Sequence, residues 1–295
     1  MAKVGIIGWG VVGQAVGQGF AKKHSVFWYD KYKEGPWTLG DVIEKSEFFF
    51  ICVPTPMYHD FSGTDLSIID GVVGNIASKI RNTSKIIIIK STVMPRTTAR
   101  LQEKYPNVNF AMNPEFLTEA NAPWDFLHPD RTIIGTFSEA VSARLATLYR
   151  TILPMRSKIF LTDPISAELV KYAANAMLSA KIIICNEIHA VAQALGVSYD
   201  NIKDMMAADP RMGGHLKVPG PDGDFGFGGK CFPKDLVALL DLGRKLKIDL
   251  SVLEAVWAKN LQVRKNYNWE EIPGAVKVIR INSKFKITNP KQILS

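Results

Sequence analysis

Hydrophobic residues in the first half of the chain fall in short runs that alternate with longer stretches of helical spacing. Runs of this length, bounded by polar or turn-forming residues, predict buried strands. The predicted strands are Lys3–Ile7, Ser25–Tyr29, Glu47–Val53, Lys85–Lys90, Asn109–Met112, Thr132–Gly135 and Lys158–Leu161. The helices predicted between them run from the first glycine-rich turn to about Lys23, over Leu66–Ile80, onward from Pro95, and from Ser138 to about Thr151. This alternation predicts a mostly parallel sheet with helices on both faces.

Beyond Asp163 the alternation ends and only helical spacing remains. Helices are predicted at Pro164 to about Leu195, Ser198–Ala208, Pro233–Leu246 and Ser251 to about Trp269. Met57–Asp65 and Asp209–Gly229 are predicted loops, and loops as long as the second are usually functional or disordered. We therefore predict an α/β fold with three parts: an N-terminal Rossmann-like doubly wound sheet at 1–163, an all-helical central domain at 164–272 and a basic tail at 273–295. Within the tail, the apolar run Ala275–Ile281 suits an added strand.

A glycine motif, Gly8-Trp-Gly-Val-Val-Gly13, lies between the first strand and the first helix, and Asp30 closes the second strand 22 residues after Gly8. In this context the motif is a strong indication of dinucleotide binding, because the glycines allow a tight turn and the helix N-terminus receives the phosphates. The Asp30 carboxylate can accept bonds from ribose hydroxyls and would repel a 2′-phosphate. NAD is therefore predicted rather than NADP, and a glycine turn that binds nothing is the weaker alternative.

A second glycine-rich segment, Asp222–Asp235, places a cysteine at the start of a predicted helix. Its glycines allow positive φ and close approach to a ligand. The helix N-terminus and the flanking Lys230 and Lys234 favour the thiolate of Cys231, and Asp235 lies one helical turn further on. Two interpretations stay open at this point: Cys231 is a nucleophile, or it is incidental to a flexible loop.

Polar residues follow the ends of three predicted strands, at Val53–Pro56, Ser91–Thr92 and Asn113–Glu119. The carboxyl ends of parallel strands meet at one edge of a sheet, where ligands bind. Glu115 and Glu119 either line a crevice at this edge or are solvated surface acids. The prolines are either part of the same crevice or simple strand terminators.

The composition is that of a globular protein, with 47% hydrophobic and 22% charged residues among 295. No apolar run is long enough to span a bilayer. The cysteines Cys52, Cys185 and Cys231 are widely spaced and odd in number, which favours a reducing, cytoplasmic setting, and no Cys or His pair has metal-ligand spacing. The formal net charge of +8 suits a phosphate-bearing small molecule, whereas the spread of the basic residues, apart from the tail, argues against nucleic acid as a partner.

Taken in order, these segments resemble the UDP-glucose/GDP-mannose dehydrogenase family. The resemblance is carried by Gly8–Gly13, Val53–Pro56, Ser91–Val93, Asn113–Leu117, Glu168–Asn175, Asn186–Glu187 and Gly226–Asp235. It implies an NAD-dependent oxidation of a primary alcohol to a carboxylate in two steps, with UDP-glucose as the expected substrate and UDP-glucuronate as the product. It also implies a homodimer formed through the central helices.

The resemblance assigns roles by position. The implied catalytic set is Cys231, Lys171, Asn175, Asp235, Glu115 and Thr92. In this set Cys231 would hold the substrate as a thiohemiacetal and then a thioester, and Glu115 would assist hydrolysis. The implied cofactor-binding residues are Gly8, Gly10, Val11, Val12, Gly13, Asp30, Val53, Pro54, Thr55, Ser91, Thr92 and Glu119. The implied substrate-binding residues are Glu115, Phe116, Leu117, Thr118, Lys171, Asn175, Arg211, Lys217, Phe225 and Gly228, with Arg211 often supplied by the partner subunit.

The family continues into a third, nucleotide-holding domain, whereas only a short segment follows Trp269 here, so the resemblance predicts a short form. Two alternatives remain. A single-step hydroxyacid dehydrogenase would not need Cys231. A non-catalytic or altered-substrate NAD-binding protein would be expected to lose some of the catalytic set, all of which is present. The particular sugar nucleotide stays open.

Overall fold

The computed structural model describes residues 1–80 and 84–277 and divides the chain into two compact units. The first unit comprises Met1–Thr55 and Leu66–Lys171, and the second comprises Pro56–Asp65 and the chain from Tyr172 onward. This division differs from the predicted boundary after Asp163 in two respects. It falls inside a helix that continues from one unit into the other, and it assigns residues 56–65 to the second unit, whose core buries Met57.

The first unit is built on a seven-stranded sheet with the order β2-β1-β3-β5-β6-β7-β8. The strands are β1 (Lys3–Ile7), β2 (Ser25–Tyr29), β3 (Phe48–Ile51), β5 (Ile86–Ile89), β6 (Asn109–Met112), β7 (Thr132–Gly135) and β8 (Ile159–Thr162). All neighbours are parallel except β6 and β7, which are antiparallel. The seven predicted strands and the Rossmann-like class are confirmed. Because the chain leaves β1 for β2 on one side and reaches β3 on the other, the order reverses between β1 and β3, where such sheets bind ligands.

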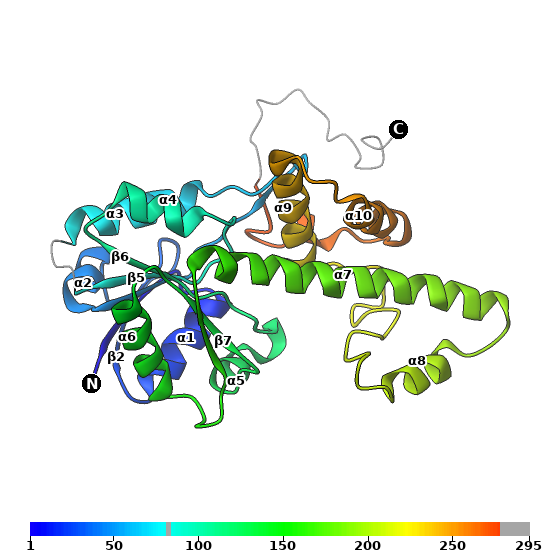
Figure 1. Ribbon diagram of the computed structural model, residues 1–295, viewed down its shortest axis with the longest axis horizontal. Helices are drawn as coiled ribbons and strands as arrows, with labels where there is room; N and C mark the ends of the chain where they lie inside the picture. The colour runs from blue at the N-terminus through cyan, green and yellow to red at the C-terminus, as the bar shows by residue number, and fades with distance from the viewer. Residues whose placement is uncertain (81–83, 278–295) are drawn as a thin grey trace. The chain divides into compact units, whose positions relative to one another are not determined.

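Helices cover both faces of this sheet (Figure 1). One face carries α1 (Val11–Ala21), α5 (Ala122–Leu127) and α6 (Glu139–Arg150), and the other α2 (Leu39–Lys45), α3 (Ser67–Lys79) and α4 (Thr97–Lys104). The alternation of side chains along β5 explains why both faces are apolar: Ile86 and Ile88 pack in one cluster, and Ile87 and Ile89 in the other. Helices α2 and α5 were not predicted from the sequence, and they are only seven and six residues long.

The second unit is mainly helical, and the described helices are α7 (Pro164–Ala194, which begins in the first unit), α8 (Tyr199–Ala207), α9 (Cys231–Leu246) and α10 (Ser251–Val263). Two predicted boundaries were wrong. Helix α9 begins at Cys231, because Pro233 is tolerated in a first turn whose N–H groups need no partner inside the helix. Helix α10 ends at Val263, because the backbone of Arg264 is extended. Trp269 lies instead in the short helix η2 (Asn268–Glu270). Its side chain is buried, and its ring centroid lies 5.8 Å from that of Trp257.

A two-stranded sheet joins segments that are far apart in sequence. Strand β4 (Met57–Tyr58) is parallel to β9 (Val276–Lys277), and Lys277 Nζ lies 2.9 Å from Asp65 Oδ2. The segment Met57–Asp65, predicted as a loop, therefore begins with a short strand. The added strand predicted at Ala275–Ile281 is confirmed at residues 276–277, and the rest of that run lies outside the described residues. No helix in the described part of the chain is long and apolar enough to cross a membrane.

Candidate active site

The glycine motif forms the turn between β1 and α1, as predicted. Gly8 has φ +96°, and a β-carbon there would lie 2.6 Å from the carbonyl oxygen of Cys52, so the end of β3 leaves no room for a side chain. Gly10 precedes α1, no side chain caps that helix, and no atom lies within 4 Å of the position that a β-carbon of Gly10 would take. The helix N-terminus thus offers backbone N–H groups beside open space, which fits the pyrophosphate of a dinucleotide.

Asp30 lies just after β2 and is held by the backbone. Its Oδ2 accepts from Trp9 N at 2.7 Å, and its Oδ1 accepts from Tyr32 N at 2.8 Å. A carboxylate oxygen has two lone pairs, so each oxygen keeps one for a further donor. The arrangement fits a residue that accepts bonds from a ribose diol.

The loops after β3 and β5 are tied to each other through Ser91. Its hydroxyl lies 2.7 Å from Val53 O and 3.1 Å from Ile51 O, so the hydroxyl hydrogen of Ser91 is donated to the backbone at the end of β3. Thr55 and Thr92 are buried at the same carboxyl edge of the sheet, whereas Pro54 is exposed. The remaining residue predicted to bind the cofactor, Glu119, is exposed at the start of the short helix η1 (Glu119–Asn121).

Two predicted catalytic residues of the first unit form a buried ion pair. Lys171 Nζ lies 3.1 Å from Glu115 Oε1, and the two side chains are only 5% and 10% exposed. Leu117 N donates to Glu115 Oε2 at 2.9 Å. Burial favours the neutral acid, but the ammonium of Lys171, the N–H of Leu117 and the ammonium of Lys90 outweigh it and lower the pKa of Glu115. Glu115 is therefore an ionised carboxylate placed to accept a proton.

The predicted substrate residues next to Glu115 divide into two kinds. The ring of Phe116 lies against two cations, with the Arg131 guanidinium carbon 4.0 Å and Lys171 Nζ 5.5 Å from its centroid. Thr118 instead forms local hydrogen bonds: its backbone N and its hydroxyl donate to Asp125 Oδ2, at 2.8 Å and 2.6 Å. Phe116 is thus joined to the ion pair, and Thr118 is not.

Behind Glu115 lies a buried network that the sequence analysis missed. Lys90 Nζ donates to Asn113 Oδ1 at 2.9 Å and to Pro114 O at 3.3 Å. Tyr149 donates its hydroxyl to the same Asn113 oxygen at 2.5 Å. Burial lowers the pKa of Lys90 to about 8. A signal was present in the sequence, because Lys90 directly follows four isoleucines at the carboxyl end of β5.

The second unit brings two more predicted residues together. Asn175 Nδ2 donates to Asp235 Oδ2 at 2.6 Å, and Lys234 forms an ion pair with the other oxygen of this fully buried carboxylate. The ammonium of Lys234 therefore faces Asp235, although the sequence analysis expected it to favour the thiolate of Cys231. Cys231 is exposed at the first position of α9. Along α7, Asn175 follows Lys171 by one helical turn, which puts these two residues on one face of the helix.

Three asparagines hold the glycine-rich loop before Cys231; none was assigned a role from the sequence, although Asn186 lies in a segment that carries the resemblance. Asn260 pairs with the backbone of Phe227, accepting from its N at 2.7 Å and donating to its O at 3.1 Å. Asn186 accepts from Gly226 N at 3.0 Å, and Asn268 accepts from Gly229 N at 2.9 Å. The loop is therefore fixed by side chains from α7, α10 and η2.

The glycines of this loop serve different purposes. A β-carbon on Gly228 would lie 2.1 Å from a guanidinium nitrogen of Arg264, so this residue, predicted to contact substrate, makes room for a protein side chain. Gly229 has φ +71° and nothing within 4 Å of the β-carbon position. The open space for a ligand is thus at Gly229, next to Lys230 and Cys231.

The other predicted substrate residues of the second unit lie away from these bonds. Arg211 and Lys217 are exposed in the loop between α8 and α9, and Arg211 Nε donates to Asp209 Oδ1 at 2.9 Å. Phe225 packs with its ring 5.1 Å from that of His189. Arg211 is thus an exposed arginine that is paired with an acid of its own loop.

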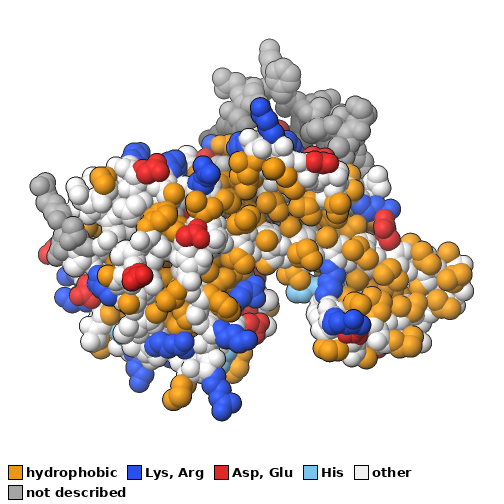
Figure 2. Space-filling model, in the orientation of Figure 1, with side chains coloured by type: hydrophobic (Ala, Val, Ile, Leu, Met, Phe, Trp, Pro, Cys, Tyr) orange, Lys and Arg blue, Asp and Glu red, His pale blue; other side chains and the backbone are white. Residues whose placement is uncertain are grey.

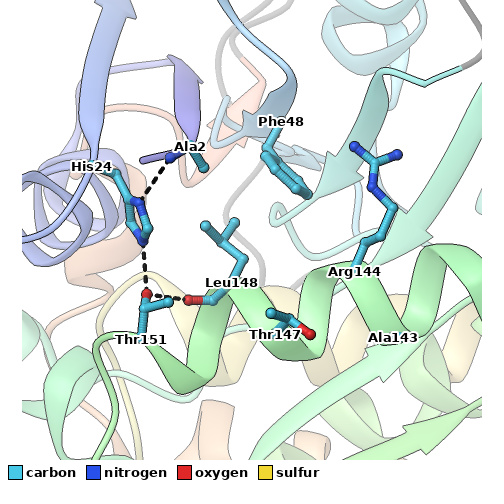
Figure 3. Close-up of a pocket in the computed structure, with 8 residues that line it drawn as sticks. All are labelled: Ala2, His24, Phe48, Ala143, Arg144, Thr147, Leu148 and Thr151. Carbon is cyan, nitrogen blue, oxygen red and sulfur yellow. Dashed lines mark hydrogen bonds between the residues drawn. The ribbon is translucent and has the colours of Figure 1, made fainter.

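A cavity of about 330 Å³ lies at the opposite, amino-terminal edge of the sheet (Figure 3). It is lined by Ala2, His24, Phe48, Ala143, Arg144, Thr147, Leu148 and Thr151. Ala2 N donates to His24 Nδ1 at 3.2 Å, and His24 Nε2 lies 2.7 Å from Thr151 Oγ1. None of the predicted site residues lines this cavity.

Two family models match the chain in sequence order. The model of the NAD binding domain of the UDP-glucose/GDP-mannose dehydrogenase family matches residues 38–153, and the model of the central domain of that family matches residues 165–262. The glycine motif and Asp30 precede the first match, so their assignment rests on the geometry described above.

Individual relatives agree with these matches. UDP-glucose 6-dehydrogenase of Rickettsia typhi is 36% identical over 215 residues, which are 72% of this chain and 48% of that protein, so the chain spans about half the length of the curated relatives it matches. A UDP-glucose dehydrogenase structure from Pyrobaculum islandicum has a TM-score of 0.77 and 28% identity, covering 88% of this chain and 68% of its own. The 3-hydroxyisobutyrate dehydrogenase of Mycobacterium tuberculosis shares the fold alone, with a TM-score of 0.71, 15% identity and coverage of 88% of this chain and 92% of its own.

Proposed function

Because the chain belongs to the UDP-glucose/GDP-mannose dehydrogenase family, we propose that it oxidises the primary alcohol of a nucleotide sugar to a carboxylate in two NAD-dependent steps. UDP-glucose is the proposed substrate and UDP-glucuronate the proposed product. The observation that carries the proposal is the pairing of predicted catalytic residues on successive turns of α7, Lys171 with Glu115 and Asn175 with Asp235. Two separate pairings of this kind are expected of a protein that has kept its catalytic site, and not of a non-catalytic protein that has lost part of it.

Cys231 explains why the reaction can proceed beyond the aldehyde. When bound, NAD supplies the oxidant by accepting a hydrogen and its electron pair in each of the two oxidations. An aldehyde carbon can be oxidised again only after a nucleophile has made it tetrahedral. We propose that the sulfur of Cys231 forms a C–S bond to this carbon while the carbonyl electron pair moves to the oxygen, which then takes a proton. Loss of hydrogen and electrons from this thiohemiacetal leaves a thioester on Cys231.

The first-unit ion pair suits the hydrolysis that follows. Glu115, ionised and buried, takes a proton from water as the water oxygen attacks the thioester carbon. The ammonium of Lys171 stabilises the negative charge that develops on the substrate oxygen. The C–S bond then breaks, the carboxylate product is released and the sulfur of Cys231 takes up a proton. The second-unit pair, Asn175 and Asp235, is proposed to hold the reacting oxygen and its water.

The proposed function is tested by NADH formation with a panel of UDP- and GDP-sugars. We expect two NADH per molecule of UDP-glucose and the uronate as the sole sugar product. Cys231→Ser is the matched control, because it keeps the size of the residue while a hydroxyl is a far weaker acid than a thiol. One NADH per sugar from the parent protein would instead indicate a single-step dehydrogenase, and no NADH with any sugar would contradict the proposal.

We also propose that the protein acts as a homodimer through the second unit. Met177, Ile184 and Val191 recur every seven residues along α7, which puts them on one face, and they are 72%, 55% and 59% exposed. Figure 2 shows hydrophobic side chains gathered on the surface over α7 and α8. A second copy of the chain would cover this face, and Arg211 of the partner subunit would then complete the substrate site. Sedimentation equilibrium of the parent and of Ile184→Asp tests this: a fully active parental monomer at micromolar concentration would contradict it.

A cytoplasmic location is proposed as well, because widely spaced cysteines suit a reducing compartment. Fractionation of expressing cells tests it, and recovery of the protein outside the cytoplasm would contradict it.

A further inference from the structure

One buried charged group has no part in the reaction as proposed above. Lys90 is 5% exposed and follows the last strand residue of β5. Its side-chain nitrogen donates to two neutral oxygens, Asn113 Oδ1 at 2.9 Å and Pro114 O at 3.3 Å. Burying an ammonium against neutral acceptors is costly, and an apolar side chain of similar length would fill the same volume without that cost. The retained charge therefore calls for a role.

The charged and titratable groups around Lys90 come from four different segments. Glu115 lies after β6, Lys171 on α7, Cys52 after β3 and Tyr149 on α6. The Cys52 thiol stays neutral, since burial raises its pKa to about 12, and burial likewise raises the pKa of Tyr149. The Lys171 ammonium repels that of Lys90, so the carboxylate of Glu115 is the only ionised acid among these groups.

We propose that Lys90 is a positioning residue for Glu115, holding the two residues that precede it and keeping its carboxylate ionised. The geometry supports both parts. Asn113 and Pro114 are the residues directly before Glu115, and Lys90 binds both of them. Its charge also acts on Glu115 in the same sense as that of Lys171, which favours the ionised acid. The inference rests on the proposed function, in which Glu115 takes a proton from the hydrolytic water.

The structure supplies a matched control for the charge of Lys90. Tyr149 donates to the same Asn113 oxygen as Lys90 does, so Tyr149→Phe removes one bond to Asn113 and no charge. Lys90→Met removes the bonds to Asn113 and Pro114 together with the charge. A scaffold role alone predicts lower turnover with an unshifted acid limb in both variants, whereas the proposed role predicts a shift of the acid limb in Lys90→Met only.

The experiment measures the pH profile of turnover and the NADH burst for the parent, Lys90→Met and Tyr149→Phe. In Lys90→Met we expect the acid limb of turnover to move to higher pH, because the pKa of Glu115 rises when a neighbouring positive charge is lost. We expect turnover at neutral pH to fall roughly tenfold while a burst of two NADH per site persists, since only hydrolysis is slowed. Tyr149→Phe should keep the parental acid limb.

A second measurement needs neither substrate nor NAD. The carboxylate absorption of Glu115, assigned by its loss in Glu115→Gln, is titrated by infrared difference spectroscopy in the parent and in Lys90→Gln, which keeps a hydrogen-bonding side chain. A midpoint at higher pH in Lys90→Gln supports the proposal. Unchanged midpoints, or equal changes in Lys90→Met and Tyr149→Phe, would overturn it. If the parent fails to form two NADH per sugar, the proposed function fails, and this titration still decides the effect of Lys90 on Glu115.

Discussion

Replacing Glu168 with glutamine is expected to change how the stability of the first unit depends on pH. Glu168 is fully buried near the start of α7, and its carboxylate accepts from Arg96 N at 2.6 Å and from Thr98 N at 2.7 Å. These N–H groups belong to the start of α4, where a helix supplies no partners of its own. Burial raises the pKa of Glu168 to about 7, although the bonds from Thr98 and Arg96 oppose the rise.

The size of the effect follows from this shift. The pKa rises from an ordinary 4.5 to about 7 on folding, and one pKa unit corresponds to 1.36 kcal/mol, so the folded state favours the protonated acid by about 3 kcal/mol. Because the folded state binds the proton more tightly than the unfolded state, this stabilisation is complete below pH 4.5 and is lost as pH rises through about 7. Glutamine is neutral at every pH, so Glu168→Gln removes the dependence.

Calorimetric unfolding of the parent and of Glu168→Gln between about pH 4.5 and 8.5 measures the effect. We expect a constant cost of about 1–3 kcal/mol for the amide, which has one acceptor oxygen for two donors. On top of it, the parent should lose up to about 3 kcal/mol relative to the variant as pH rises. Glu103→Gln, the same change at an exposed position of α4, is the control and should leave the pH dependence unchanged. Parallel stability curves for the parent and Glu168→Gln would refute the reasoning.

Three further predictions concern the site. Cys231→Ala is expected to yield at most one NADH per sugar, because no thiol can make the aldehyde carbon tetrahedral, and two NADH at the parental rate would show the assigned role to be wrong. Asp30 is expected to make NAD bind more tightly than NADP, so equal affinities by titration calorimetry would remove that argument. Asn260→Ala removes both bonds to Phe227 and should lower kcat roughly tenfold or more, with NAD affinity unchanged; parental kcat would contradict a positioning role.

Most of the fold followed from patterns that act over a few residues. Asn109–Met112 and α7 lie where the side-chain period and the flanking turn residues predict them, because burial on one face imposes that period locally. The same holds for Gly8–Gly13, where a strand, a tight turn and a helix are adjacent in the sequence. The start of α9 was misplaced by two residues because Pro233 is equally acceptable at several positions of a first helical turn.

The chemistry of the candidate site was decided by contacts between distant residues. Nothing local distinguishes Lys171 from a solvated helical lysine or Glu115 from a surface acid, and only the folded first unit buries both and pairs them at 3.1 Å. Lys90 and Asn113 meet across 23 residues, and Asn260 reaches Phe227 across 33. The charge state and the bonds of a side chain depend on what surrounds it after folding, on burial, neighbouring charges and available donors, and no spacing along the chain encodes these.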